Sequence, residues 1–303
     1  MPAGSAQKQY GYEKMMNTDI GTLRSQVIDK VLLKQDDSFR WGHDEKQARQ
    51  RPEYLYYSPN FKSTLWTLLL LADLQAPLAI PQVNVSIRLI CDHFYDPAHG
   101  VFRLPGMSHF PIPCLNGNMI YLQHYFGAPN PEALEKTIAF FADYQRFDDG
   151  DYKTPDAYPY AANGSCYGSH TCFWGVTKLL KGISFIPREE RSSEAQQLIE
   201  KCIDYVLQHE VCFSSRHGEK LLNRDIGILK FPNFYKSDFL EILWLLAREG
   251  VHDRRMRRAL ELLRSKMKAG GTWELEKAMN TIVPIGEKGC ANAFITERAS
   301  TMG

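Results

Sequence analysis

The sequence predicts an all-α fold built from stacked helical hairpins, and three observations support this prediction. Apolar residues recur at helical spacing in segment after segment of the 303 residues. Almost no segment alternates between apolar and polar residues with period two, which argues against a sheet-based fold. Short glycine–aromatic turns follow the helical segments at steps on the order of 50 residues or a multiple, a period typical of repeat architectures.

Helical periodicity defines the segments, which in order are residues 20–34, 61–74, 83–94, 115–126, 131–144, 170–183, 193–209, 235–248 and 254–267. The first carries Leu23 and further apolar residues one turn apart. Pro59 precedes the second segment and Pro81 precedes the third. The fourth ends at Gly127, and the fifth begins with Pro131, whose missing N–H costs nothing in a first turn.

The later boundaries follow the same signals. The sixth segment follows a stretch rich in glycine and serine and stops before Pro187. The seventh begins at Ser193, and the last two end shortly before Gly250 and Gly270. Glycine is typical just after a helix because it readily adopts the left-handed conformation of a C-terminal cap.

The turns between the helices also repeat. In each, a glycine or another small residue precedes an aromatic residue: Ser38-Phe39, Gly100-Val101-Phe102, Gly150-Asp151-Tyr152 and Gly271-Thr272-Trp273. Pro-Asn-Phe enters two strongly apolar segments, at residues 59–61 and 232–234. A single hairpin cannot bury its apolar face alone, so neighbouring hairpins must stack. A linear solenoid and a closed ring both satisfy this requirement.

Composition bounds the class of protein. The chain carries 36 Lys plus Arg against 35 Asp plus Glu, a net charge of +1. A nucleic-acid-binding protein needs a basic excess, so this balance argues against that class. No apolar stretch approaches the roughly 20 residues of a membrane-spanning helix. The first residues lack the apolar core of a signal peptide, and we therefore expect a cytoplasmic protein.

We expect one domain over residues 1–303, because repeated hairpins need no domain boundary. Residues 1–15 are expected to form a flexible tail, and residues 299–303 to lie outside the core. The chain contains seven cysteines. An odd number without small-scaffold spacing does not indicate a disulfide framework, so we expect reduced thiols, metal ligands or core residues.

One turn carries a motif of a known family. Gln145 precedes Gly150 and Tyr152 with the pattern Gln-x4-Gly-x-aromatic. This resembles the Gln-Trp repeat of squalene cyclases, Gln-x3-Gly-x-Trp, with one inserted residue and Tyr in place of Trp. Gly271 and Trp273 give a second Gly-x-Trp, without an upstream Gln.

A second segment resembles protein prenyltransferase β subunits. Residues 169–173, Ser-His-Thr-Cys-Phe, are similar to a Tyr-His-Thr-Cys-Tyr helix start in which the His binds zinc. Those subunits carry a zinc-binding Asp-x-Cys about one hairpin earlier, where this chain has Ile112-Pro113-Cys114 and lacks the Asp. Together the motifs imply the prenyltransferase and squalene-cyclase-like superfamily. The fold it implies is an α/α toroid, either incomplete or compact, because the helices fall short of six hairpins.

The same segment contains candidate metal ligands. Thiolate and imidazole are the preferred donors for zinc, which the resemblance implies as the cofactor. Cys166 and His170, four residues apart, share a face if both are helical; if Ser169 caps the helix, Cys166 lies in a loop and can turn inward. The expected set is Cys114, Cys166, His170 and Cys172. The alternative is that the cysteines are small core residues.

A toroid would enclose a central cavity with an aromatic wall. The expected lining residues are Tyr57, Trp66, Asn118, Trp174, Tyr235 and Trp244. Aromatic faces suit an isoprenoid chain and can stabilise a carbocation, although most aromatic residues on inner helices only pack the core. Basic residues that could receive a diphosphate are Arg216, Arg224, Lys230 and Lys236.

Three functions remain open from the sequence. The first is a prenyltransferase- or squalene-cyclase-like enzyme that acts on an isoprenoid or other apolar substrate, with catalytic residues that the sequence does not identify. The second is a toroid that binds an apolar ligand or a metal without turning it over. The third is a helical-repeat scaffold that binds another protein on a concave surface. The first two predict an apolar small molecule as partner.

Overall fold

A computed structural model describes residues 19–106, 110–127 and 130–302, and this part of the chain is mostly α-helical. The predicted N-terminal tail, residues 1–15, lies outside the described residues. The helices are α2 (Ile20–Leu32), α3 (Glu45–Ala48), α4 (Thr64–Asp73), α5 (Pro81–Phe94), α6 (Pro113–Phe126), α7 (Pro131–Tyr144), α8 (Gly164–Tyr167), α9 (Phe173–Ser184), α10 (Ser193–Gln208), α11 (Phe239–Arg248), α12 (Arg257–Ser265) and α13 (Ala293–Ser300). The strands found in the described residues are β1 (Tyr95–Asp96), β2 (Val101–Phe102), β3 (Lys230–Phe231) and β4 (Lys277–Ala278).

The predicted helical class is therefore confirmed, and every predicted segment contains an α-helix. Helix starts follow local capping. The Asn130 side chain accepts a hydrogen bond from the Ala133 amide and starts α7. The Asp238 side chain accepts from the Glu241 amide, so α11 begins at Phe239, four residues later than predicted.

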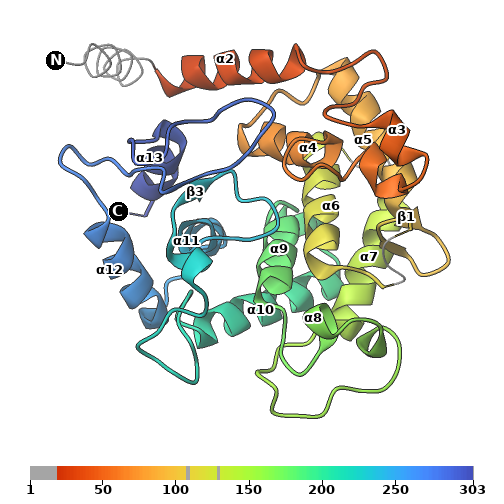
Figure 1. The fold of residues 1–303 in the computed structure, drawn as a ribbon. Coiled ribbons are helices and arrows are strands. Elements are labelled where there is room, and N and C mark those ends of the chain that lie inside the picture. The colour runs from red at the N-terminus through yellow and green to blue at the C-terminus, as the bar shows by residue number, and fades with distance from the viewer. Residues whose placement is uncertain (1–18, 107–109, 128–129, 303) are drawn as a thin grey trace.

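Burial separates the helices into two groups. Nearly every residue of α4 is buried, and α6, α9 and α11 are buried along most of their length, whereas only Ala259 and Leu263 are buried in α12. We call α4, α6, α9, α11 and α13 the central helices and α2, α5, α7, α10 and α12 the peripheral helices. Peripheral and central helices alternate along the chain, and the peripheral helices lie around the outside in Figure 1.

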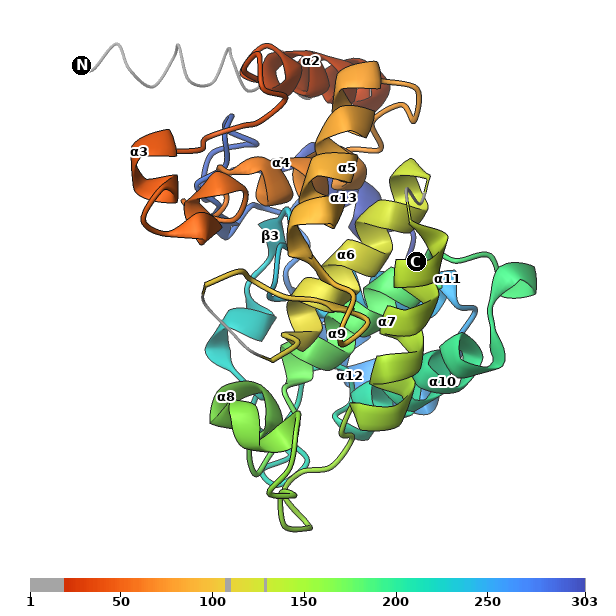
Figure 2. The same cartoon turned by 90° about the vertical axis from the view of Figure 1, so that its right-hand side faces the viewer.

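Consecutive central helices contact one another: α4 with α6, α6 with α9, α9 with α11, and α11 with α13. On one side of the molecule, α6 also contacts both α5 and α7, which flank it in Figure 2. None of the described helices is long and apolar enough to cross a membrane.

Glycines let α6 and α9 pack very closely. A Cβ on Gly117 would lie 2.3 Å from the Lys178 carbonyl carbon, and one on Gly182 would lie 2.6 Å from the Gly117 carbonyl oxygen. A Cβ on Gly175 would lie 2.7 Å from Pro113. The contacting positions advance together along both helices, so α6 and α9 run parallel.

A repeated contact supports the internal repeat. In three places a backbone amide donates to a threonine hydroxyl 23 residues later: Trp41 to Thr64 (3.1 Å), Asp148 to Thr171 (2.9 Å) and Trp273 to Thr296 (3.1 Å). The indoles of Trp41 and Trp273 each donate to a carbonyl ten residues earlier, at 2.9 and 2.8 Å. The turn between a peripheral and a central helix is thus built in the same way near both ends of the chain.

Charged side chains lie buried between the central helices. Lys178 on α9 is 2.6 Å from Glu241 on α11, and Lys181 is 3.0 Å from the same carboxylate and 2.6 Å from Asp73 on α4. The Tyr121 hydroxyl donates to Asp73 at 3.2 Å. Burial of the Glu241 carboxyl raises its pKa, but the charges of Lys178 and Lys181 outweigh this effect. The pKa of Glu241 is therefore held well below its usual range. We call these five residues the ionic cluster.

One prediction about the C-terminus is wrong at Ala299. Residues 299–303 were expected outside the core; Ser300 and Thr301 are exposed, but Ala299 is buried in α13. The Asn292 side chain caps this helix by accepting from the amides of Phe294 and Ile295. Phe294 and Ile295 are buried, and α13 packs against α11. The packing of this short helix brings Ala299 into the core.

Candidate functional site

Most of the predicted lining residues meet where the central helices begin. The rings of Tyr57 and Trp66 are 4.9 Å apart, and Trp66 is 6.1 Å from the ring of Tyr235. The Trp66 indole donates to the Tyr57 carbonyl at 2.7 Å. Burial raises the pKa of Tyr57. These aromatic side chains therefore form one packed cluster that joins the start of α4 to the segment before α11.

The two Pro-Asn-Phe segments meet in this cluster. Phe61 stacks on Phe234 with ring centroids 5.0 Å apart and on Tyr235 at 5.9 Å. The side-chain amide of Asn118 on α6 donates to the Phe234 carbonyl at 3.2 Å, while its Oδ1 has no hydrogen-bond partner in the described residues. Asn118 thus fixes the backbone of Phe234, one of the stacked aromatic residues.

The remaining predicted lining residues lie apart from the cluster. Trp174 on α9 lies beside it, with the Lys236 ammonium 4.7 Å from its ring. Trp244 lies elsewhere, in a cavity formed by the C-terminal halves of central helices. The sequence analysis therefore placed in one cavity residues that the fold separates between the two ends of the central helices.

A cavity of about 280 Å³ opens beside the stacked rings. One wall is aromatic, and the other side carries charged side chains and the segment after β4. The residues that line it are Phe61, Asp225, Lys230, Phe234, Tyr235, Lys236, Lys277, Ala278, Met279 and Asn280. We call it the lysine–aromatic cavity.

Three lysines of this cavity surround one carboxylate. Strands β3 and β4 pair in parallel with Lys230 opposite Lys277, an arrangement in which like charges repel. Lys277 Nζ is 3.2 Å from Asp225 Oδ1 and Lys236 Nζ is 3.6 Å from Oδ2. Hydrogen bonding from Lys277 lowers the pKa of Asp225. Asp225 therefore faces three cations, one of which, Lys230, is also attracted by Asp238.

Lys230 is the most informative of the three lysines. The residue is only 4% exposed, and its Nζ donates to the backbone carbonyl of Asp225 at 3.3 Å. No carboxylate of the described residues lies within ion-pair distance of this ammonium. Burial lowers the pKa of Lys230, against the attraction of Asp238 and Asp225. A buried ammonium without a contacting anion is costly, and an anionic ligand would offset that cost.

The predicted cysteine ligands also come together near this end. The Cys166 thiol donates to the Cys172 sulfur, and Cys114 lies close enough to interact electrostatically with both cysteines. Cys172 is the N-cap residue of α9. The hydrogen bond from Cys166 lowers the pKa of Cys172 against the effect of burial, and the amides of Gly175 and Trp174 act in the same direction. Burial raises the pKa of Cys114 to about 12.

His170 hydrogen-bonds to the backbone of the preceding turn. Its Nδ1 lies 2.7 Å from the Asp149 carbonyl oxygen, and its side chain is exposed. Among the described residues, no group of three or more His, Cys, Asp or Glu side chains is arranged to hold a metal ion. The chemistry of the donors suits zinc, but the four side chains do not converge on one point.

Sequence reasoning did not single out Phe61, Asp225 or Lys277. The repeated Pro-Asn-Phe pattern is a signal that could have identified Phe61, since it matches Phe234. Lys277 reaches the site through a pairing of two-residue strands 47 residues apart, which leaves no local pattern. Asp225 is the first-turn acid of a short 3-10 helix, and only the fold surrounds it with lysines.

Comparison with known proteins adds no relative: no family model matches the chain, and no curated protein matches it at a significant level. The resemblance to the prenyltransferase and squalene-cyclase-like superfamily therefore stays a prediction. Function has to be argued from the geometry and chemistry of the site.

Proposed function

We propose that this protein binds an amphiphilic anion in the lysine–aromatic cavity, with an isoprenoid-like or other apolar body and a phosphate or diphosphate head. The observation that carries the proposal is the buried ammonium of Lys230, which contacts a backbone carbonyl and lines a cavity. With Lys236 and Lys277 it forms a cationic pole that Asp225, together with Asp238 beside Lys230, neutralises only in part.

The rest of the cavity suits the apolar part of such a ligand. Phe61 and Tyr235 present nearly parallel rings, with an interplanar angle of 12°. Ala278 and Met279 line the cavity as well, and a methionine side chain adapts to an irregular apolar surface. A small number of charged groups at one side of an apolar wall is the usual composition of a small-molecule site.

We further propose that the central helices close into an α/α toroid of five hairpins. Support comes from the alternation of central and peripheral helices and from the threonine contacts repeated along the chain. The first and last described helices also meet, because Arg24 on α2 pairs with Glu297 on α13 at 2.7 Å. The lysine–aromatic cavity would then lie at the end of the ring where α4 and α11 begin.

Prenyl transfer is the second candidate function, and the low pKa of the Cys172 thiol favours it. Zinc, which the resemblance implies, does not fit the four predicted ligands as they are placed, so no step is derived through it. Metal analysis of the purified protein tests the zinc-dependent form of this proposal. Near-stoichiometric zinc would support it, and protein free of zinc would contradict it.

Isothermal titration calorimetry tests the binding proposal with three probes: farnesyl diphosphate, inorganic pyrophosphate and farnesol. We expect the diphosphate ester to bind most tightly, because only it engages both the lysines and the aromatic wall. Replacement Lys277→Met should weaken its binding about tenfold, the order expected for one charge-assisted contact.

Lys268→Met is the matched control, since Lys268 is an exposed lysine whose ammonium also lies 3.2 Å from a carboxylate, that of Glu274. It should leave binding unchanged. Equal affinity for the ester and for farnesol would contradict a role of the lysines, and equal loss in both variants would contradict the location.

A further inference from the structure

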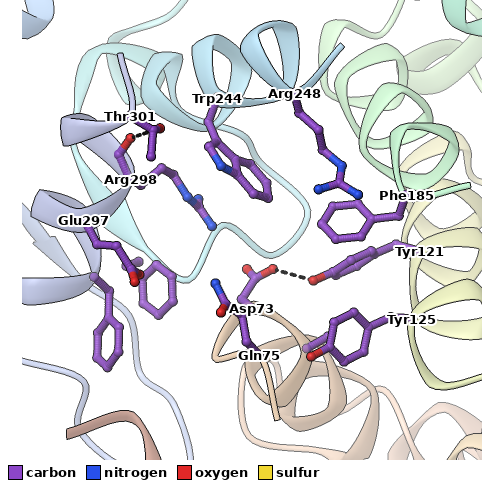
Figure 3. A pocket seen from close by; sticks show the side chains of 13 residues that line it. Asp73, Gln75, Tyr121, Tyr125, Phe185, Trp244, Arg248, Glu297, Arg298 and Thr301 are labelled. Carbon is purple, nitrogen blue, oxygen red and sulfur yellow. Dashed lines mark hydrogen bonds between the residues drawn. The ribbon is translucent and has the colours of Figure 1, made fainter. Parts of the chain in front are cut away.

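A second cavity, of about 290 Å³, lies at the opposite end of the central helices (Figure 3). Side chains from α4, α6, α11 and α13 point into it, together with Phe185 after α9. Its aromatic lining consists of Tyr121, Tyr125, Phe185, Phe231, Trp244 and Phe294. This volume approaches the range of about 300–1,000 Å³ typical of small-molecule sites.

Arg298 is the central charge of this cavity. The residue is 9% exposed, and its guanidinium lies 4.6 Å from the ring of Trp244 and 5.4 Å from that of Phe231. One nitrogen donates to Asn233 Oδ1, a neutral acceptor, at 3.1 Å. Among the described residues, no carboxylate pairs with Arg298, and its other N–H groups find no acceptor.

The neighbouring ionic cluster supplies only part of the missing counter-charge. Its two carboxylates, Asp73 and Glu241, are in direct contact with Lys178 and Lys181, and Arg298 acts on Glu241 only from beyond ion-pair distance. Arg298 is therefore a surplus buried cation. Burying an unpaired charge is strongly unfavourable, so the cavity is prepared for an anion.

The other charged side chains that line the cavity do not neutralise the positive charge of Arg298. Glu297 is paired with Arg24, whose guanidinium donates to both of its oxygens at 2.8 and 2.7 Å. Arg248 donates to the Ser184 carbonyl at the end of α9 and lies over the ring of Phe185 at 4.2 Å. Arg248 thus offsets the partial negative charge of a helix C-terminus, and Arg298 stays free for a ligand.

We infer that this cavity binds a small organic carboxylate with an aromatic or apolar body. The carboxylate would accept hydrogen bonds from the guanidinium of Arg298, whose planar set of donors matches a carboxylate. The body would lie among the aromatic side chains, beside Trp244 and Tyr125. This site is separate from the lysine–aromatic cavity, and the inference holds whether or not that cavity binds its proposed ligand.

Phenylacetate and its neutral isostere phenylacetamide are the probes, titrated into the full-length protein by calorimetry. We expect phenylacetate to bind with a Kd of about 1 mM or tighter and the amide to bind at least tenfold more weakly. Arg298→Met should weaken phenylacetate binding about tenfold or more, because a charge-assisted contact in a buried site is lost.

Two further variants keep the test decisive. Arg248→Met changes an exposed residue of the cavity wall and should weaken binding to a smaller extent, even if Arg298→Met proves unstable. Arg264→Met, on the exposed face of α12, should have no effect. Absence of phenylacetate binding to the wild-type protein, equal binding of the amide, or unchanged binding to a folded Arg298→Met variant would each overturn the inference.

Discussion

Removal of the Lys178 charge should destabilise the protein more than removal of any exposed lysine. Lys178 and Glu241 are both 0% exposed, and the lysine also donates to the Asn233 carbonyl. Burial lowers the pKa of Lys178 to about 8, although the Glu241 charge opposes this shift. The replacement Lys178→Met keeps a similar unbranched chain but leaves Glu241 buried with Lys181 as its ion-pair partner.

The expected cost follows from that geometry. Breaking a buried ion pair by removing one partner costs roughly 3–5 kcal/mol. Since Lys181 still contacts Glu241, we expect the lower end, about 3 kcal/mol. The unfolding entropy of a 303-residue chain, at roughly 2.1 cal/mol/K per residue, is about 0.6 kcal/mol/K, which converts this cost to a fall in Tm of about 5 °C.

Thermal and urea unfolding, followed by circular dichroism, provide the assay. Lys266→Met is the matched control because its pair with Glu276 has a similar length, 2.7 Å, but side chains 21% and 31% exposed. Its loss should cost less than about 1 kcal/mol. The double variant Lys178→Met/Glu241→Leu should recover much of the stability, since Lys181 and Asp73 remain paired. If Lys178→Met unfolds like Lys266→Met, the reasoning about the ionic cluster is refuted.

Three further predictions address the thiols, the repeat and the shape. Cys172 should react with iodoacetamide at pH 7 before Cys202, because the pKa of Cys172 is lowered whereas burial raises that of Cys202. The replacement Cys166→Ala should slow the labelling of Cys172, as measured by peptide mass spectrometry. Thr64→Val leaves the Trp41 amide without its acceptor and should cost about 1–3 kcal/mol in urea unfolding, whereas an unchanged midpoint would contradict the role of this contact. A closed toroid predicts a radius of gyration of about 19 Å by small-angle scattering; a clearly larger value would indicate an open superhelix.

Sequence patterns located the long helices well because their signals are local. Pro131 defines the first turn of α7, and the predicted range matches the helix. The start of α11 was placed too early because Tyr235, at the predicted start, packs in the aromatic cluster, and Asp238 caps the helix that follows. Helix α13 was missed because it is short, and its place depends on packing against α11.

The candidate site was predictable only where neighbouring residues in the sequence act together. Trp66 and Tyr235 follow the repeated Pro-Asn-Phe segments, and the fold brings them together. Lys277 reaches Lys230 through tertiary pairing, which no local pattern reveals. His170 follows the motif of the resembled family, yet its Nδ1 contacts the Asp149 carbonyl, and no group of three possible metal ligands forms among the described residues.

The most direct test of the central claim is lysine footprinting, in which acetylation is measured by mass spectrometry with and without farnesyl diphosphate. Lys236 and Lys277 line the lysine–aromatic cavity and remain partly exposed, so a bound ligand should protect both. Lys268, exposed and outside the cavity, serves as the internal control. Protection of Lys236 and Lys277 with unchanged labelling of Lys268 is the predicted result; equal labelling of all three at saturating ligand would contradict the account.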